Sequence, residues 1–438
     1  MTAATLSAGD TAWVLVSAGF VLLMIPGLAL FYAGLVRSRA ALNTIMMSVA
    51  ALGVVTVQWT LIGYSLAFGH GGAVGGAEWF GLGNIGLGAG PYSATIPHLA
   101  FAVFQAMFAA ITVALISGAL VERIRFHVYL IFAAAWTTLV YDPLAHWVWS
   151  ADGWLHRLGA LDFAGGTVVH ISAGTAALVA AMILGRRRDQ GRTPLRPHNV
   201  VYTITGAGLL WVGWFGFNGG SALAADGVAA NALVTTHAAA AAALVTWMIV
   251  DYVRDRQATA VGAATGAVVG LVAITPAAGY VTPLSALLIG AAGAVASNAA
   301  IQLRNRTRVD DALDVFACHG VAGIVGALLT GVFATTAVNP AGANGLLAGN
   351  AHQLLVQSLA VACTIAFTGS VTAIVLLPLS ALGALRVSLA DEVGGVDRSE
   401  HGEHAYDDGD GSLVAGGGIR LGDAVLLSTV PDEQADAA

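Results

Sequence analysis

Two histidines stand at matching positions in two similar segments of the chain. His170 lies in DFAGGTVVHISAG, residues 162–174, and His319 lies in DALDVFACHGVAG, residues 311–323. In each segment an Asp stands eight residues before the His and a Gly stands four residues after it. Imidazole is the side chain whose ordinary proton affinity lies near physiological pH. Two facing rings can therefore share a proton and pass hydrogen bonds along an apolar path.

A metal site is the alternative use of two histidines. Zinc takes three or four protein ligands, at spacings such as HExxH. No Cys or second His lies three to five residues from His170 or His319, and Asp162 and Asp311 are two helical turns away. A metal-dependent hydrolase would also need a third ligand or a nucleophile beside His170 and His319. We therefore expect no metal, no cofactor and no enzymatic activity.

The elements that position these histidines are expected to be membrane-spanning helices. Of the 438 residues, 57% are hydrophobic and only 10% are charged, whereas a soluble domain has roughly a quarter of its residues charged. Of the 25 acidic residues, 12 lie between Asp391 and Asp436, so the net charge of −7 describes the tail. The composition excludes a soluble or disordered chain and indicates no nucleic-acid surface. It predicts an all-α protein embedded in a lipid bilayer.

Apolar runs of about 20 residues are long enough to cross the hydrocarbon core as helices. Helices also satisfy every backbone polar group within the segment, which lipid cannot do. The sequence predicts eleven such spans, near residues 11–36, 43–68, 98–121, 126–149, 163–185, 200–219, 229–252, 258–275, 280–303, 313–336 and 351–386.

The arginines predict the orientation of these spans. All 18 basic residues are Arg, and with alternating connections 17 of them fall on the side of Arg37, leaving only Arg157 on the other. Cytoplasmic loops carry the excess of positive charge. The N-terminus is therefore expected outside and the C-terminus inside, in agreement with an odd number of spans.

The two histidine segments predict an inverted repeat. The first opens the fifth span and the second opens the tenth, so repeats of about 11–185 and 200–336 cross the bilayer in opposite directions, with an extra helix at 351–386. Eight residues of helix place each His about 12 Å inward from its Asp. Since the two start from opposite faces, both imidazoles are expected near the midplane, where transporter sites of this architecture lie.

Two further carboxylates need an explanation. Asp162 stands before the Gly-rich start of the fifth span, where it could cap the helix and complement its dipole, or its negative field could attract a cation. Both interpretations remain open at this stage. Asp142, before Pro143 in the fourth span, stands where an apolar residue is expected, and the sequence assigns it no role.

Five motifs make the chain resemble the Amt branch of the Amt/Rh family of ammonium transporters, over about residues 11–406. They are the histidine segment 162–174, LISGALVERIRF at 115–126, GWFGFNGGSA at 213–222, ITPAAG at 274–279 and DVFACHG at 314–320. The resemblance implies a homotrimer in which each subunit has eleven spans and its own pore. It also implies a cell membrane location, as in the inner membrane of a bacterium.

The resemblance further implies a role for each matching residue. Ammonium is recruited from outside by aromatic faces, each attracting a cation by about 0.5–2 kcal/mol, and by a hydroxyl. The recruitment positions are Phe104, Phe108, Trp149 and Ser221, with Asp162 nearby; the gate is Phe108 and Phe217; the pore lining includes Trp214 and Thr275; the proton relay is His170 and His319.

These roles imply a mechanism based on the cost of burying charge. A bare cation is expensive in an apolar tube, but ammonium, unlike potassium, can give up a proton. We expect deprotonation near the gate, passage of ammonia, and relay of the proton along His170 and His319. Passage of ammonia without the proton remains open. An ammonium sensor of the same fold with little transport is the alternative function, although no signalling domain follows residue 406.

The tail, residues 387–438, resembles the family's cytoplasmic regulatory region through ALRVSLADEVGGVD and EHGEHAY. The resemblance implies packing under the trimer and possible regulation by a PII signalling protein. Beyond about residue 407 the polar, acidic composition predicts disorder.

Overall fold

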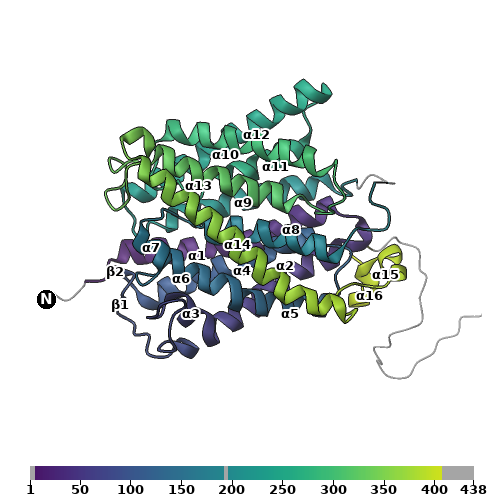
Figure 1. The fold of residues 1–438 in the computed structure, drawn as a ribbon, viewed down its shortest axis with the longest axis horizontal. Helices are drawn as coiled ribbons and strands as arrows, with labels where there is room; N and C mark the ends of the chain where they lie inside the picture. Colours follow the sequence, from purple (N-terminus) through teal and green to yellow (C-terminus); the bar gives the residue numbers. More distant parts are fainter. Residues whose placement is uncertain (1–4, 192–195, 407–438) are drawn as a thin grey trace, which may run out of the picture. The chain divides into compact units, whose positions relative to one another are not determined.

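The protein is almost entirely helical in the computed structural model, which describes residues 5–191 and 196–406 (Figure 1). Its main α-helices are α1 Ala8–Leu35, α2 Ala41–Gln58, α3 Tyr64–Phe68, α4 His98–Ile116, α5 Phe126–Trp136, α6 Asp142–Trp149, α7 Trp154–Leu158, α8 Ser172–Leu184, α9 Val200–Gly220, α10 Gly227–Asp255, α11 Ala260–Ile274, α12 Pro283–Arg304, α13 Ala322–Phe333 and α14 Ala351–Ala381. Short 3-10 turns lie at η1 Ser38–Ala40, η3 Phe80–Leu82, η4 Ser117–Ala119 and η8 Leu346–Ala348.

Ten continuous helical segments of the described chain are long and apolar enough to cross a membrane. They are Ala8–Leu35, Ser38–Phe68, His98–Ala119, Phe126–Leu158, Gly166–Leu184, Val200–Gly220, Gly227–Asp255, Pro283–Arg304, Phe316–Phe333 and Ala351–Ala381. The expectation of a multi-pass, mostly helical membrane protein is therefore confirmed.

The remaining predicted span, 258–275, corresponds to the shorter helix α11. With 15 residues it is about 22 Å long, less than the roughly 30 Å of the hydrocarbon core. Pro276 follows Thr275 directly, and a proline disfavours helical backbone in the residue before it. The chain continues from there in tight turns, in which Ala277 N–H donates to Ile274 O and Tyr280 N–H donates to Ala277 O.

Four π-helical segments interrupt the α-helices of the described chain. They are η2 Trp59–Gly63, η5 Thr137–Tyr141, η6 Gly166–Ile171 and η7 Phe316–Val321. Such segments are rare and are found frequently at functional sites. Here η6 contains His170 and η7 contains His319.

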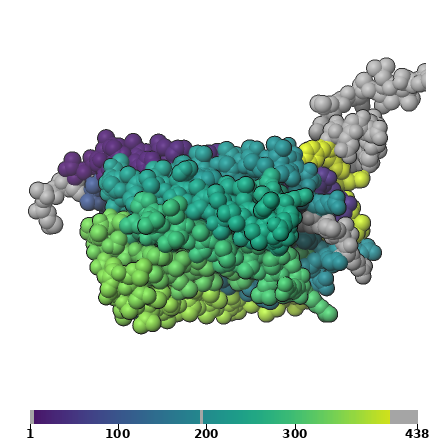
Figure 2. Space-filling model, turned by 90° about the horizontal axis from the view of Figure 1, so that it is seen from above, coloured from purple at the N-terminus to yellow at the C-terminus, as the bar shows by residue number. Residues whose placement is uncertain are grey.

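Helices that are distant in sequence pack closely through small residues. α1 lies along α9, as the purple and teal surfaces of Figure 2 show. A Cβ added at Gly34 would lie 2.4 Å from Oγ1 of Thr203, and one at Gly206 would lie 2.3 Å from the backbone nitrogen of Phe31. Small residues allow this close backbone approach, which replaces the hydrophobic effect as a source of helix association in lipid.

The two histidine-bearing helices cross in opposite directions. A Cβ at Gly174 would lie 2.2 Å from the backbone nitrogen of Gly320, whereas a Cβ at Gly323 would lie 3.1 Å from Gly166 O. The contact partner thus moves backward along one helix as the position moves forward along the other. This is the relation that an inverted repeat requires.

A two-stranded antiparallel sheet adds a small β element to the expected all-α fold. It consists of β1 Ala89–Gly90 and β2 Ser93–Pro97, in the connection that leads into α4. Ala89 pairs with Pro97, and Gly90 pairs with Ser93.

The arginines of the connections gather at one end of the helix bundle. Arg37, Arg187, Arg254 and Arg304 line a single cavity there, and Arg123 is bonded to Asp310 beside it. We call this the arginine-rich end, and we call the other end of the helices the opposite end.

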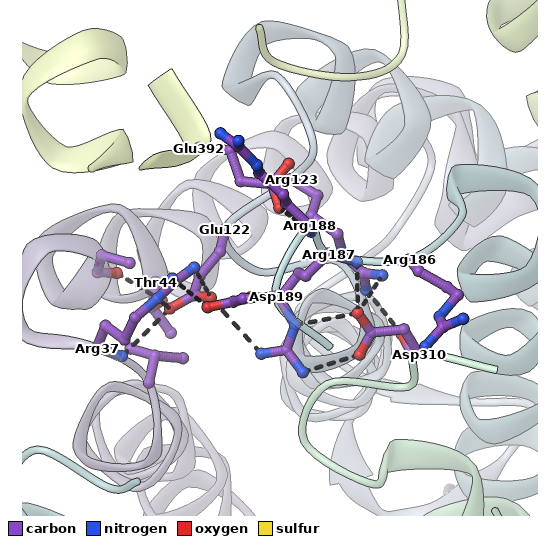
Figure 3. A network of polar contacts seen from close by, with 12 residues as sticks. Arg37, Thr44, Glu122, Arg123, Arg186, Arg187, Arg188, Asp189, Asp310 and Glu392 are labelled. Carbon is purple, nitrogen blue, oxygen red and sulfur yellow. Dashed lines mark hydrogen bonds and ion pairs between the residues drawn. The ribbon is translucent and has the colours of Figure 1, made fainter. Parts of the chain in front are cut away.

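An ion-pair network joins the connections at the arginine-rich end (Figure 3). Arg187 donates to both carboxylate oxygens of Asp310, at 3.0 and 2.8 Å, and its Nη1 lies 3.5 Å from Glu122. Arg123 lies 3.2 Å from Asp310, and Arg37 lies 2.5 Å from Glu122. The network therefore fastens the segments that follow α1, α4, α8 and α12 to one another.

The first part of the tail packs on the bundle rather than forming a separate body. Residues up to Ala405 belong to one compact unit, which includes α15 Leu389–Gly394 and α16 Val396–His401. Asp397 accepts hydrogen bonds from the N–H groups of Leu42 and Asn43, at 3.0 and 2.7 Å. The predicted disorder beyond residue 407 lies outside the described residues.

Candidate functional site

The structure brings the two histidines together inside the bundle. Nδ1 of His319 lies 3.4 Å from Nδ1 of His170, and the ring centroids are 5.5 Å apart with an interplanar angle of 19°. Both side chains are buried, with exposed fractions of 1% and 3%. With one nitrogen protonated and the other free, the pair forms a direct hydrogen bond.

A tryptophan fixes the other face of His170. The Trp214 ring stacks on it at 5.4 Å with an angle of 17°. The Trp214 indole N–H donates to the Thr275 hydroxyl at 2.8 Å, and that hydroxyl donates to Leu271 O, also at 2.8 Å. Thr275 thus acts on the site through Trp214, whose orientation it sets.

Two stacked phenyl rings close the path next to the histidines. The Phe108 and Phe217 centroids are 4.1 Å apart with an angle of 14°, and both side chains are buried. Phe217 lies 6.0 Å from the His170 ring. The order along the path is therefore Phe108, Phe217, His170 and His319.

The residues predicted to recruit ammonium cluster on the far side of Phe108. Phe104 packs edge-on against it at 4.9 Å and is fully buried, and Trp149 does so at 6.1 Å and remains half-buried. Ser221 donates its hydroxyl to Phe217 O at 2.8 Å. The oxygen of that hydroxyl keeps its capacity to accept a hydrogen bond.

Asp162 caps the helix that carries His170. Its Oδ1 accepts from the N–H groups of Gly165 and Gly166, at 2.8 and 2.5 Å. Its Oδ2 accepts from Thr167 N–H at 2.8 Å, from Val168 N–H at 3.2 Å and from the Thr167 hydroxyl. Of the two interpretations that the sequence left open, the geometry supports the cap, because a cation ligand would have to displace these bonds.

Asp162 also contacts Trp149, one of the residues predicted to recruit ammonium. The Trp149 indole N–H donates to the backbone oxygen of Asp162 at 2.9 Å. Asp162 thus both caps the helix that carries His170 and orients the Trp149 ring.

Two cavities meet at His319. A narrow apolar one is lined by Met24, Leu28, Phe31, Ile111, Leu115, His170, Leu210, Trp214, Phe217, Val268 and His319. A wide one of about 730 Å³ opens at the arginine-rich end, and charged residues such as Asp251, Asp314 and Arg304 line it. His319 therefore stands between an apolar path and a polar mouth.

Sequence reasoning missed the apolar part of the lining. Leu28, Ile111, Leu115, Leu210 and Val268 are aliphatic residues in apolar spans. Nothing in their local pattern distinguishes a pore-facing side chain from a lipid-facing or core-facing one. Only the packing of four different helices identifies them.

The stacked rings, the paired imidazoles and the two cavities define a polytopic membrane protein with a narrow path through its helix bundle. Residues 12–406 match the profile of the Ammonium Transporter Family. The ammonium transporter of Bacillus subtilis is 48% identical over 402 residues, which are 91% of this chain and 99% of that protein.

Solved structures agree with this match. The crystal structure of Saccharomyces cerevisiae Mep2 has a TM-score of 0.83 at 40% identity and covers 88% of this chain and 91% of its own. A structure described as Sensor Amt Protein also has a TM-score of 0.83, at 30% identity, and covers 90% of this chain and 98% of its own. The chain belongs to the ammonium transporter family.

Proposed function

We propose that this protein conducts ammonium across a cell membrane, by binding the cation outside the gate and passing ammonia through the apolar cavity. The proton travels along His170 and His319. The observation that carries the proposal is the single column in which Phe108 and Phe217 lead to the imidazole pair. The named relatives of this family support ammonium as the substrate.

The cavity chemistry favours a neutral species next to the gate. Between Phe217 and His319 the lining is aromatic and aliphatic apart from the two imidazoles. An unpaired cation in such surroundings costs many kcal/mol, whereas ammonia can exchange hydrogen bonds with imidazole nitrogens. His170 Nε2 has no hydrogen-bond partner in the described part of the chain, although it is buried. This nitrogen is the site that we assign to the passing molecule.

We further propose eleven spans, in two inverted repeats of about 11–185 and 200–336 plus α14, with the N-terminus outside. The short helix α11 then crosses together with the turns that follow it. The gathering of arginines at one end of the bundle supports this orientation by the positive-inside rule. The antiparallel crossing at Gly174 and Gly320 supports the inversion.

A homotrimer in the cell membrane completes the proposal. His237 lies exposed in the middle of α10, against the rings of Trp211 and Phe215 of α9. The buried indole N–H of Trp211 has no partner within residues 5–191 and 196–406. Polar groups at this depth are costly in contact with lipid, so a neighbouring subunit is the better cover for this face.

A PII signalling protein is the proposed partner at the arginine-rich end, where the tail packs.

Current from purified protein in liposomes on a solid-supported membrane tests the transport proposal. We expect a transient current after an ammonium jump, none after a potassium jump, and loss of the ammonium current in the His170→Ala/His319→Ala variant. His352→Ala is the matched control, since that imidazole is exposed at the start of α14 and lines neither cavity.

Two other results would redirect the proposal. No current, with alkalinisation still reported by a trapped dye, would mean that ammonia passes without its proton. Silence in both assays, with ammonium binding intact, would favour a sensor, the alternative that the similarity to Sensor Amt Protein keeps in view.

A further inference from the structure

A second buried polar pair lies away from the ammonium path. Nε2 of Gln58, the last residue of α2, donates to Oδ2 of Asp142, the first residue of α6, at 2.6 Å. The same Nε2 donates to the Thr138 hydroxyl at 3.1 Å. Asp142 has no exposed surface and Gln58 is 8% exposed. Neither residue lines the narrow cavity or the wide one.

The pair flanks the two π-helical segments that do not carry histidines. Gln58 directly precedes η2, and Asp142 directly follows η5. The Gln58 amide fills space that a glycine leaves free, because a Cβ at Gly63 would lie 2.6 Å from its Oε1. The four π segments of the described chain therefore accompany two buried polar pairs, His170 with His319 and Gln58 with Asp142.

If the Asp142 carboxylate is ionised, the pair leaves two buried oxygen atoms without hydrogen-bond donors. Asp142 Oδ1 and Gln58 Oε1 are both buried, and both lack a hydrogen-bond partner among the described residues. No arginine or histidine lies within ion-pair distance of Asp142 in that part of the chain. A carboxylate with a single donor and no counter-ion is among the costliest groups to bury in a bilayer.

We propose that Asp142 holds a proton in the folded protein, so that Gln58 and Asp142 form an intramembrane proton-binding site. The proton turns Oδ1 from an acceptor into a donor, and Gln58 Oε1 is the orphan acceptor on the side chain already bonded to Asp142. Acid and amide then bond reciprocally, Nε2–H to Oδ2 and Oδ1–H to Oε1. One proton thereby satisfies two buried atoms and removes the uncompensated charge.

Infrared spectroscopy of the full-length protein in liposomes tests this assignment directly. The wild-type-minus-Asp142→Asn spectrum should contain the C=O stretching band of a protonated carboxylic acid at neutral pH. In Gln58→Leu that band should move to higher wavenumber, because the acid loses its amide partner. Carboxylate bands in place of the acid band in the Asp142→Asn difference would overturn the proposal. Glu403→Gln, an exposed tail position, is the control and should remove carboxylate bands only.

Thermal unfolding provides the second readout. An unfolded aspartic acid releases its proton above about pH 4, so the folded protein must hold a proton that the unfolded chain gives up. The Tm of Asp142→Asn, whose amide supplies an N–H in place of the O–H, should therefore rise relative to wild type as the pH increases from about 5 to 8. A pH-independent difference between the two would contradict a bound proton.

The surrounding titratable groups do not account for such a difference, since none of them forms an ion pair with Asp142. The titratable groups of its segment and of the elements packed against it are Tyr64, His98, His127, Tyr129, Tyr141, His146, His156, Arg157, His170, His352 and Cys363. All of them are unchanged in Asp142→Asn, so their titrations cancel in the comparison with wild type.

Discussion

At the scale of single residues, the Thr275 hydroxyl links the end of α11 to the ring that stacks on His170. Thr275 accepts from the Trp214 indole and donates to Leu271 O, so both of its hydrogen-bonding directions are used. Trp214 in turn stacks on His170. The chain of contacts runs from the end of α11 to the His170 imidazole, which we propose to receive the passing molecule.

Thr275→Val should therefore damage the site without changing its shape. The substitution leaves the buried Trp214 N–H without an acceptor, which costs about 1–3 kcal/mol. We expect a lower Tm of the purified protein and a smaller ammonium current. Thr275→Ser, which restores the hydroxyl, should recover most of both. Wild-type current and Tm in the valine variant would show that Trp214 is held by packing alone.

At the scale of elements, Asp162 and Asp311, the acids at matching positions of the two histidine segments, accept different numbers of hydrogen bonds. Asp162 satisfies four backbone N–H groups and one hydroxyl at the start of its helix. Asp311 accepts from Phe316 N–H at 2.7 Å, and its Oδ1 has no partner in the described residues. The repeat is thus preserved in sequence spacing but not in hydrogen bonding.

This asymmetry predicts unequal effects of the same substitution. Asp162→Asn turns one acceptor oxygen into a donor that faces backbone N–H groups, and charged hydrogen bonds contribute about 1.5–3 kcal/mol. We expect a clearly lower Tm for Asp162→Asn than for Asp311→Asn, together with a shift of Trp149 fluorescence only in the former. Equal losses of Tm would mean that the cap is not the main role of Asp162.

A second element-scale prediction concerns the start of α2. Ala40 precedes this helix and supplies no side-chain cap, whereas Asp397 of the tail accepts from Leu42 and Asn43. Removing a cap costs about 0.5–2 kcal/mol. In Asp397→Ala the amides of Leu42 and Asn43 should exchange hydrogen faster than in wild type. Glu403→Ala should leave their exchange unchanged, and protection that persists in Asp397→Ala would assign the cap to another group.

At the scale of the whole molecule, the ion-pair network of Figure 3 joins the tail to the start of the His319 helix. Glu392 accepts from the Arg188 N–H at 2.7 Å and pairs with Arg386 at 2.6 Å. Next to Arg188, Arg187 is bonded to Asp310. Asp310 immediately precedes Asp311, which bonds the first residue of η7. The described tail and the His319 helix are thus connected through the buried charges of Glu392, Arg187 and Asp310.

The pH dependence of this network follows from Asp310. Burial acts to raise the pKa of its carboxyl, but the charges and hydrogen bonds of Arg123 and Arg187 outweigh it and hold the pKa below the ordinary value. Because the folded-state pKa is lowered, the ionised carboxylate stabilises the folded protein at every pH above the unfolded value of about 4. This stabilisation is lost as the pH falls through the folded-state pKa.

Asp310→Asn should therefore destabilise the protein strongly at neutral pH. Breaking a buried pair costs about 3–5 kcal/mol, because two arginines lose their counter-charge. The Tm difference from wild type should begin to shrink as the pH falls below the unfolded value of about 4, and it should continue to shrink until the pH passes the lowered folded-state pKa of Asp310. A difference that stays constant over this range would attribute the loss to packing rather than to charge.

The sequence by itself predicted that the helices lie in a lipid bilayer. It also predicted the number of long apolar segments to within one, and that the arginines of the connections gather at one end of the bundle. These properties are local sums over composition and spacing. The eight-residue spacing also predicted that His170 and His319 occupy equivalent positions, although the residues between each Asp and its His are not helical throughout, since η6 begins only at Gly166 and η7 at Phe316. The predicted span 258–275 differs from α11 by only two residues at its start and one at its end, and both end before Pro276.

Tertiary structure alone decided which partners these residues have. The partners of Asp142 and Asp397 lie 84 and 355 residues away in the chain. Such pairings depend on how helices cross, and crossing depends on the sum of many side-chain contacts. The π-helical segments follow the same rule, since a local sequence does not show which turn must widen to fit a neighbouring helix. For that reason the site's residue types could be predicted, whereas its lining, its caps and the bonding of Asp142 required the packed bundle.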